Sequence, residues 1–172
     1  MVWRRLLRSF AATLAALLLA ACASSSFDGR VYSGDGVHFR VGKVPSSWRT
    51  LELDDTLLAF RDDSANATVA VNGRCGLDGD DVPLTSLTQH LFLQFTDRVQ
   101  LSQTKLSLDG REALRTEISA ALDGVKKQYL VYVLKKDSCV YDFMYISADT
   151  AANQTRPRAD FEHFVQGFAA LE

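Results

Sequence analysis

Alternating apolar and polar residues predict several β-strands along this chain. The run Val37-His38-Phe39-Arg40-Val41 shows the pattern first, as in a strand buried on one face. Asp-Gly pairs at 109–110 and 123–124 favour tight hairpins between later strands, because glycine accepts a positive φ. The predicted strands are Val37–Val41, Arg49–Leu53, Leu57–Arg61, Ala67–Asn72, Val99–Leu108, Arg111–Leu122, Val125–Lys135 and Cys139–Ser147.

Two segments carry apolar residues at helical spacing instead. One follows Pro83 and continues to Phe95, and the other closes the chain from Phe161 to Leu171. The late strands 125–135 and 139–147 are apolar on both faces, so their sheet needs cover on both sides. The pattern therefore predicts an α+β fold, in which an antiparallel β-sheet is covered by helices on both faces.

The N-terminal segment resembles the signal peptide of a bacterial lipoprotein. Three arginines precede the apolar stretch Phe10–Leu19, and small residues lead into Cys22. This order describes a secretory signal, whereas a membrane-spanning helix, the alternative, needs about 20 apolar residues. We expect residues 1–21 to be a signal peptide, 22–34 a lipidated tether, and 35–172 a single α+β domain.

The run Leu19-Ala20-Ala21-Cys22 ends like a lipobox. The resemblance implies cleavage before Cys22 and acylation of that residue, and two or more acyl chains hold a protein firmly on a membrane. Ala23 stands where an aspartate would retain a lipoprotein at the inner membrane. The expected location is therefore the outer membrane, facing the periplasm.

An exported chain enters an oxidising compartment, where cysteine pairs are usually bridged. Cys75 and Cys139 are the two cysteines besides Cys22. We expect a disulfide between them; two separate buried thiols are the alternative.

The order of the predicted elements resembles the PsbP-like fold, which many bacterial lipoproteins share. The resemblance covers roughly residues 35–171, and it implies an α-β-α sandwich with accessory, mostly non-enzymatic roles. Cys75 and Cys139 are not part of the general pattern. The matching runs are Phe39-Arg40-Val41, Pro45-Ser46-Ser47-Trp48, Leu57-Leu58-Ala59-Phe60, Leu108-Asp109-Gly110-Arg111-Glu112-Ala113, Asp123-Gly124 and Phe161 to Phe168.

Charge and motifs exclude several classes of function. Without the three arginines of the signal, 16 basic residues face 21 acidic ones, a net charge of −5 that disfavours nucleic acid as a partner. His38, His90 and His163 stand singly, without the spacing of a metal site. The chain also lacks a nucleophile elbow, a P-loop and a dinucleotide fingerprint. We expect no cofactor, no metal and no catalytic residue.

Tyr141, Phe143 and Tyr145 share one face of a predicted strand. Such a row can form a face for a ligand or a partner, but more often it is core beneath a helix.

Three functions follow from these patterns. The leading one is a lipid-anchored accessory protein of the cell envelope that acts by binding another envelope protein. A carrier or sensor of a small hydrophobic ligand is the second. The third is an envelope hydrolase, which requires His90 or His163 beside a carboxylate and a hydroxyl in one cleft.

Overall fold

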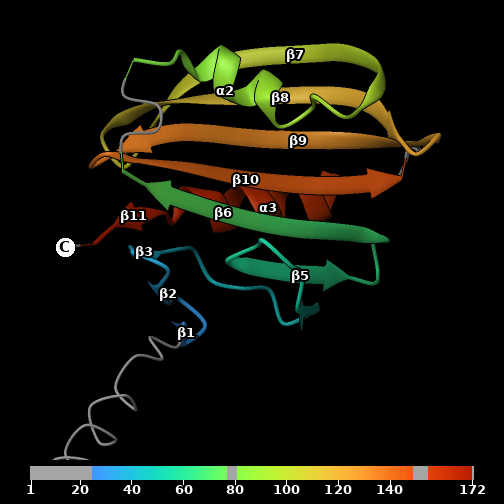
Figure 1. The fold of residues 1–172 in the computed structure, drawn as a ribbon. Coiled ribbons are helices and arrows are strands. Elements are labelled where there is room, and N and C mark those ends of the chain that lie inside the picture. The colour runs from blue at the N-terminus through green and yellow to red at the C-terminus, as the bar shows by residue number, and fades with distance from the viewer. Residues whose placement is uncertain (1–24, 77–80, 149–154, 172) are drawn as a thin grey trace, which may run out of the picture.

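The computed structural model describes residues 25–76, 81–148 and 155–171. They form a seven-stranded antiparallel sheet in the order β4-β5-β6-β10-β9-β8-β7 and a four-stranded sheet in the order β1-β2-β3-β11 (Figure 1). In this part of the chain, no helix is long and apolar enough to cross a bilayer. The elements are β1 Ser26–Phe27, β2 Val31–Gly34, β3 Val37–Arg40, β4 Trp48–Leu51, β5 Leu58–Asp62, β6 Ala67–Cys75, α2 Leu84–His90, β7 Thr96–Leu108, β8 Arg111–Leu122, β9 Val125–Lys136, β10 Cys139–Ala148, α3 Thr155–Gln166 and β11 Ala169–Ala170.

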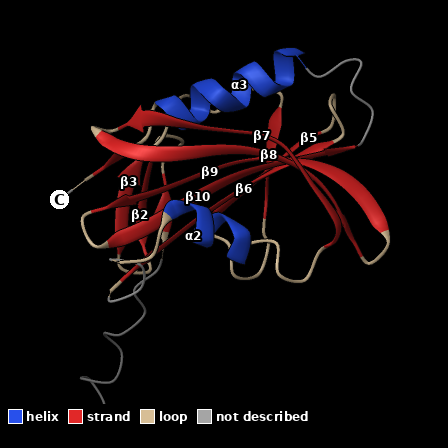
Figure 2. Cartoon of the chain, turned by 90° about the horizontal axis from the view of Figure 1, so that it is seen from above, coloured by secondary structure: helices blue, strands red, loops and turns tan. Residues whose placement is uncertain are grey.

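The predicted α+β fold, with helices over both faces of one sheet, is wrong. The described chain is mostly β and forms two sheets, and its helices α2 and α3 have 7 and 12 residues. One helix does lie on each face of the large sheet, but α2 spans only part of its face (Figure 2). The predicted helix after Pro83 is shortened because the chain turns at Leu91–Phe95 and enters β7.

Part of the segment assigned to a tether is folded. Residues 26–34 include β1 and β2, which pair with each other, and β2 pairs in turn with β3. Tyr32 on β2 is 2% exposed, and its ring stacks on Phe39 at a centroid distance of 5.2 Å. The ordered domain therefore includes Ser26, whereas Cys22 and the predicted signal peptide lie outside the described residues.

The meander of strands β7, β8, β9 and β10 confirms the hairpins predicted from the Asp-Gly pairs. Asp109 and Gly110 have φ values of 49° and 71°, and Asp123 and Gly124 have values of 50° and 77°. Positive φ at both central residues is the geometry of a type I′ turn, which matches the twist of the strands on either side.

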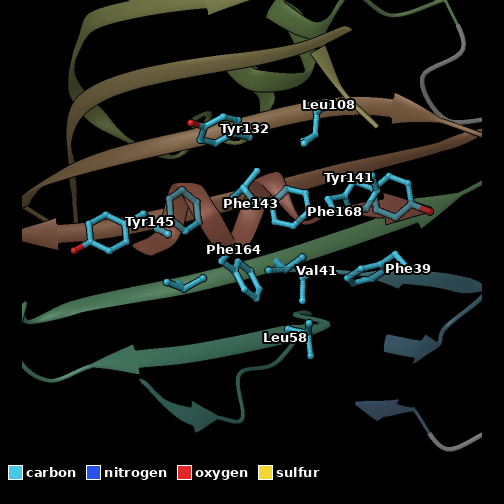
Figure 3. Close-up of a cluster of buried hydrophobic side chains, with 14 of the residues drawn as sticks. Phe39, Val41, Leu58, Leu108, Tyr132, Tyr141, Phe143, Tyr145, Phe164 and Phe168 are labelled. Atoms are coloured by element: carbon cyan, nitrogen blue, oxygen red, sulfur yellow. The ribbon is translucent and has the colours of Figure 1, made fainter. Parts of the chain in front are cut away.

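Two apolar clusters fill the faces of the large sheet. The cluster beneath α3 also includes side chains of β2 and β3, so the small sheet and α3 together cover one face (Figure 3). The second cluster lies under α2 and includes Leu87, Phe92, Tyr129 and Val131. Burial of each large side chain contributes about 1.5–3 kcal/mol, so both clusters stabilise the sheet.

The chain after β3 and the end of α3 approach each other closely enough for a backbone contact. The Gly42 N–H donates a 2.8 Å hydrogen bond to the Phe164 carbonyl. A Cβ at Gly42 or at Gly167 would overlap the backbone of the other segment. Glycine at both positions therefore allows the helix to approach the strand this closely.

Candidate functional site

The aromatic row on β10 is core. Tyr141, Phe143 and Tyr145 are 2%, 0% and 1% exposed. Phe168 packs on Tyr141 at 4.8 Å and on Phe143 at 5.4 Å between ring centroids, and Phe161 packs on Tyr145 at 5.5 Å. The row therefore corresponds to the core alternative, because its rings pack against Phe161 and Phe168.

Cys75 and Cys139 form a disulfide, as expected from the sequence. They lie opposite each other on β6 and β10, with Cα atoms 4.0 Å apart. The bond joins the last residue of β6 to the first residue of β10, two neighbouring strands in the middle of the large sheet.

The histidines do not assemble a catalytic or metal centre within the described residues. His90 on α2 and His163 on α3 are exposed, and neither lines the clefts described below. No three His, Cys, Asp or Glu residues come together there in a metal-binding group. The arrangement required for the hydrolase hypothesis is therefore not observed at these two histidines.

Asp142 is a buried carboxylate that the sequence analysis missed. It is 2% exposed on β10, and its Oδ2 accepts a 3.1 Å hydrogen bond from the side-chain nitrogen of Asn72 on β6. Its Oδ1 lies 3.8 Å from Arg74, beyond hydrogen-bond distance. Burial raises the pKa of Asp142, while Asn72 and Arg74 act in the opposite direction. The sequence did contain a signal for this buried acid: Asp142 is the single acidic residue between Val140 and Met144 in an otherwise apolar strand.

A charge network joins β8 to α3. Arg115 contacts Glu162 at 2.9 Å and Glu117 at 2.8 Å, and Arg158 contacts Glu117 at 2.9 Å. Burial opposes the charge on Arg115, but Glu162 and Glu117 together raise the pKa of its guanidinium. Burial and the charge of Glu162 also raise the pKa of Tyr132 to about 12. The network therefore links α3 to the large sheet.

The most exposed element of the large sheet is its edge strand β7. It has 13 residues and pairs with β8 on one side, and no other described strand pairs with it. All but three of its side chains are exposed. Along such an edge, backbone N–H and C=O groups are open to pairing with another chain.

The two halves of β7 differ in regularity. Register shifts interrupt pairing between Thr96 and Val99 and between Gln100 and Ser102. From Ser102 to Leu108, however, pairing with β8 runs without interruption to Arg111. Bulges protect an edge against added strands, so the regular run 102–108 is the part that can accept one.

A cleft of about 460 Å³ adjoins this regular run. It lies between the start of α2 and the β7–β8 hairpin, and we call it the cationic cleft because three of its residues are basic. Leu114 contributes a side chain that is 2% exposed. The lining residues are Pro83, Leu84, Thr85, Lys105, Gly110, Arg111, Glu112, Leu114 and Lys135.

A second cleft, of about 800 Å³, lies between β1 and the connection from β4 to β5. Ser25, Phe27 and Tyr32 line one side, and residues 50–54 and 56–59 line the other. The lining includes two acidic residues, Glu52 and Asp54, and no basic residue. We call it the β1 cleft.

Comparison with known proteins identifies the fold. No family model and no curated protein sequence matches the chain. The solution structure of cyanobacterial PsbP (CyanoP) from Synechocystis is similar with a TM-score of 0.57 and 12% identity, over 90% of this chain and 99% of that one. LpqN of Mycobacterium tuberculosis, involved in cell envelope biogenesis, has a TM-score of 0.53 and 13% identity, over 87% and 90%.

The Ran-binding protein Mog1p of Saccharomyces cerevisiae is also similar, with a TM-score of 0.58 and 11% identity, over 88% of this chain and 97% of that one. The fold is thus PsbP-like, as the sequence resemblance implied, although its layers differ from the predicted sandwich. At these identities the likeness concerns the fold alone, since one fold supports many functions.

Proposed function

We propose that this chain is a lipid-anchored protein of the cell envelope that acts by binding another envelope protein through the open edge of β7. The observation that carries the proposal is the uninterrupted run Ser102–Leu108, which offers an unpaired backbone edge. Strand addition to such an edge is a common mode of peptide recognition, because the main chain supplies the hydrogen bonds. Catalysis and a cofactor have no part in this function.

The lipid anchor follows from Cys22 and the signal-like segment before it. Three residues separate Cys22 from Ser26, where β1 begins. An extended residue spans at most about 3.6 Å, so Ser26 lies within roughly 15 Å of the acylated residue. This reach holds β1 and the β1 cleft close to the bilayer surface.

Strand β7 is well placed for a partner in this orientation. It forms the edge of the large sheet farthest in strand order from β4, while β1 lies at the other end of the molecule (Figure 1). A domain held by residues 22–25 therefore directs β7 away from the membrane. Placement at the outer membrane, facing the periplasm, follows from Ala23 and belongs to the same proposal.

The similar structures are in keeping with this function. LpqN is described as involved in cell envelope biogenesis, and Mog1p as a Ran-binding protein. Each description concerns that protein alone: that of Mog1p supports a binding role on this fold, and that of LpqN supports a role in the envelope. The acidic net charge supports a protein partner over nucleic acid.

Site-specific photo-crosslinking in cells tests the proposal. A photoreactive residue at Gln103 or Ser107 on β7 should give one discrete crosslinked product. The same residue at Asp123, on the exposed β8–β9 turn, is the matched control. Equal products from all three positions, or none from β7, would overturn binding through this edge.

A further inference from the structure

The charge of the cationic cleft differs in sign from that of the chain. Lys105, Arg111 and Lys135 face a single lining carboxylate, Glu112, whereas the whole chain has a net charge of −2. Lys105 pairs with Glu112 at 3.1 Å, with side chains that are 66% and 55% exposed. Exposed pairs of this kind are weak, so an incoming carboxylate can compete for Lys105.

Arg111 adds directional donors to the cleft. It is exposed, and its Nε donates a long 3.5 Å hydrogen bond to the Lys135 carbonyl. The Lys135 ammonium donates to the Val82 carbonyl at 3.0 Å, which holds that charge at the wall of the cleft. A guanidinium binds carboxylates through two parallel hydrogen bonds, so Arg111 suits an acidic side chain.

The cleft and the open edge share Lys105. Lys105 lies opposite Leu114 on β8, and both side chains line the cleft. Since side chains alternate along a strand, Gln103 and Ser107 share this face with Lys105. The partly buried Leu106 packs against the core beneath α3, on the opposite face. A strand added beside β7 would therefore place alternate side chains toward the cleft and toward Leu106.

We propose that the segment that adds to β7 is an acidic, extended peptide of the partner protein, with an Asp or Glu directed at Lys105 and Arg111 and apolar residues alternating on the other face. This inference rests on the proposed binding through β7 and specifies its partner. The apolar wall of Leu84 and Leu114 accepts the aliphatic stem of that acid. The main chain provides affinity, and the cleft provides specificity.

A second copy of this chain fits the edge less well. If the regular runs Ser102–Leu108 of two copies paired antiparallel about their centre, Lys105 would lie opposite Lys105 of the other copy. Like charges directly opposite each other destabilise a strand pair. The same cations would attract, rather than repel, an acidic peptide.

The test uses a displayed library of random ten-residue peptides, selected on the purified domain with its disulfide intact. The binding variant is Lys105→Glu/Arg111→Glu. The matched control is Arg40→Glu/Lys43→Glu, which changes the net charge equally at two exposed residues away from the cleft. Circular dichroism checks that both variants are folded.

We expect the selected peptides to be rich in Asp and Glu. Their affinity should fall at least tenfold in the cleft variant, should be unchanged in the control, and should weaken with salt. In NMR spectra, the bound peptide should slow amide exchange within Ser102–Leu108.

Each other outcome has a defined meaning. Selected peptides that slow amide exchange in β7 but are not enriched in Asp and Glu would overturn the proposal of an acidic partner and leave binding through β7 intact. The same holds for peptides that bind the cleft variant as tightly as the native domain. Acidic peptides or inorganic phosphate that bind the cleft without protecting β7 would overturn the strand addition. Concentration-dependent dimers that protect β7 would assign the edge to a second copy. A selection that yields no binder would overturn both proposals.

Discussion

Asn72 on β6 lies directly opposite Asp142 on β10, and each side chain has one oxygen without a hydrogen-bond partner. The Asn72 nitrogen donates to Asp142 Oδ2 at 3.1 Å, while Asn72 Oδ1 and Asp142 Oδ1 are buried and unpaired. Three side-chain oxygens therefore share one donor group, the Asn72 amide nitrogen, because Arg74 lies 3.8 Å from Asp142 Oδ1, beyond hydrogen-bond distance. A proton on Asp142 would supply a second donor to the pair.

Replacement of Asp142 by Asn should stabilise the protein at neutral pH by about 1 kcal/mol, because an amide supplies the missing donor. Burial raises the pKa of Asp142 above its ordinary value of 3.8, so the folded state binds this proton more tightly than the unfolded state. The contribution of Asp142 to stability is therefore present at low pH and is lost as the pH rises through the raised pKa. Urea unfolding of both proteins from pH 4 to pH 8 measures the difference.

Asp62 provides the matched control for this change. It is also 2% exposed, but its Oδ1 already accepts hydrogen bonds from the backbone and hydroxyl of Ser64 and from the Ala65 N–H. Asp62→Asn should lower stability, since hydrogen bonds to a charged acceptor are stronger. A loss of stability in Asp142→Asn equal to that in Asp62→Asn would contradict the account of the Asn72–Asp142 pair.

Removal of the disulfide should lower stability by about 2–4 kcal/mol, because it frees a long loop in the unfolded chain. The double variant Cys75→Ala/Cys139→Ala tests this by thermal unfolding, with and without reductant. Reductant should lower the unfolding midpoint of the native protein and leave that of the variant unchanged. Labelling of both thiols in the unreduced, denatured protein would contradict the bridge.

Replacement of Arg115 by Met should destabilise the protein by about 2 kcal/mol, since it removes charge-assisted hydrogen bonds to Glu162 and leaves Glu117 with Arg158 alone. The control Lys105→Met breaks an exposed ion pair and should cost less than about 0.5 kcal/mol. Chemical unfolding at low and high salt measures both. Equal losses in the two variants would show that the network adds nothing to the attachment of α3.

Cys22→Ser should abolish lipid labelling and release the protein from membranes or leave its leader uncleaved, because serine cannot form the thioether. Fractionation of cells fed a labelled fatty acid provides the measurement. Cys75→Ala/Cys139→Ala is the control, since it loses two cysteines and keeps Cys22. A lipid-labelled, membrane-bound Cys22→Ser protein would refute the anchor and the orientation drawn from it.

The local pattern of the sequence predicted most strands and their hairpins. The Asp-Gly pairs at 109–110 and 123–124 bounded the predicted strand Arg111–Leu122, and β8 has the same bounds. These features depend on near neighbours: side chains that alternate across a strand, and residues that accept positive φ. The disulfide was predictable as well, because export and an even cysteine pair suffice for that inference.

Tertiary contacts decided the layers and the site. Residues 26–34 form strands because β2 pairs with β3, and α2 ends at His90 because the chain turns there into β7. Neither feature can be predicted from the local sequence pattern. The same holds for the partner of Asp142 and for the open edge. The sequence alone determined which segments are strands and how they turn. Only the folded structure decided which strand lies at the edge and which charges surround it, because strand order joins residues that are distant along the chain.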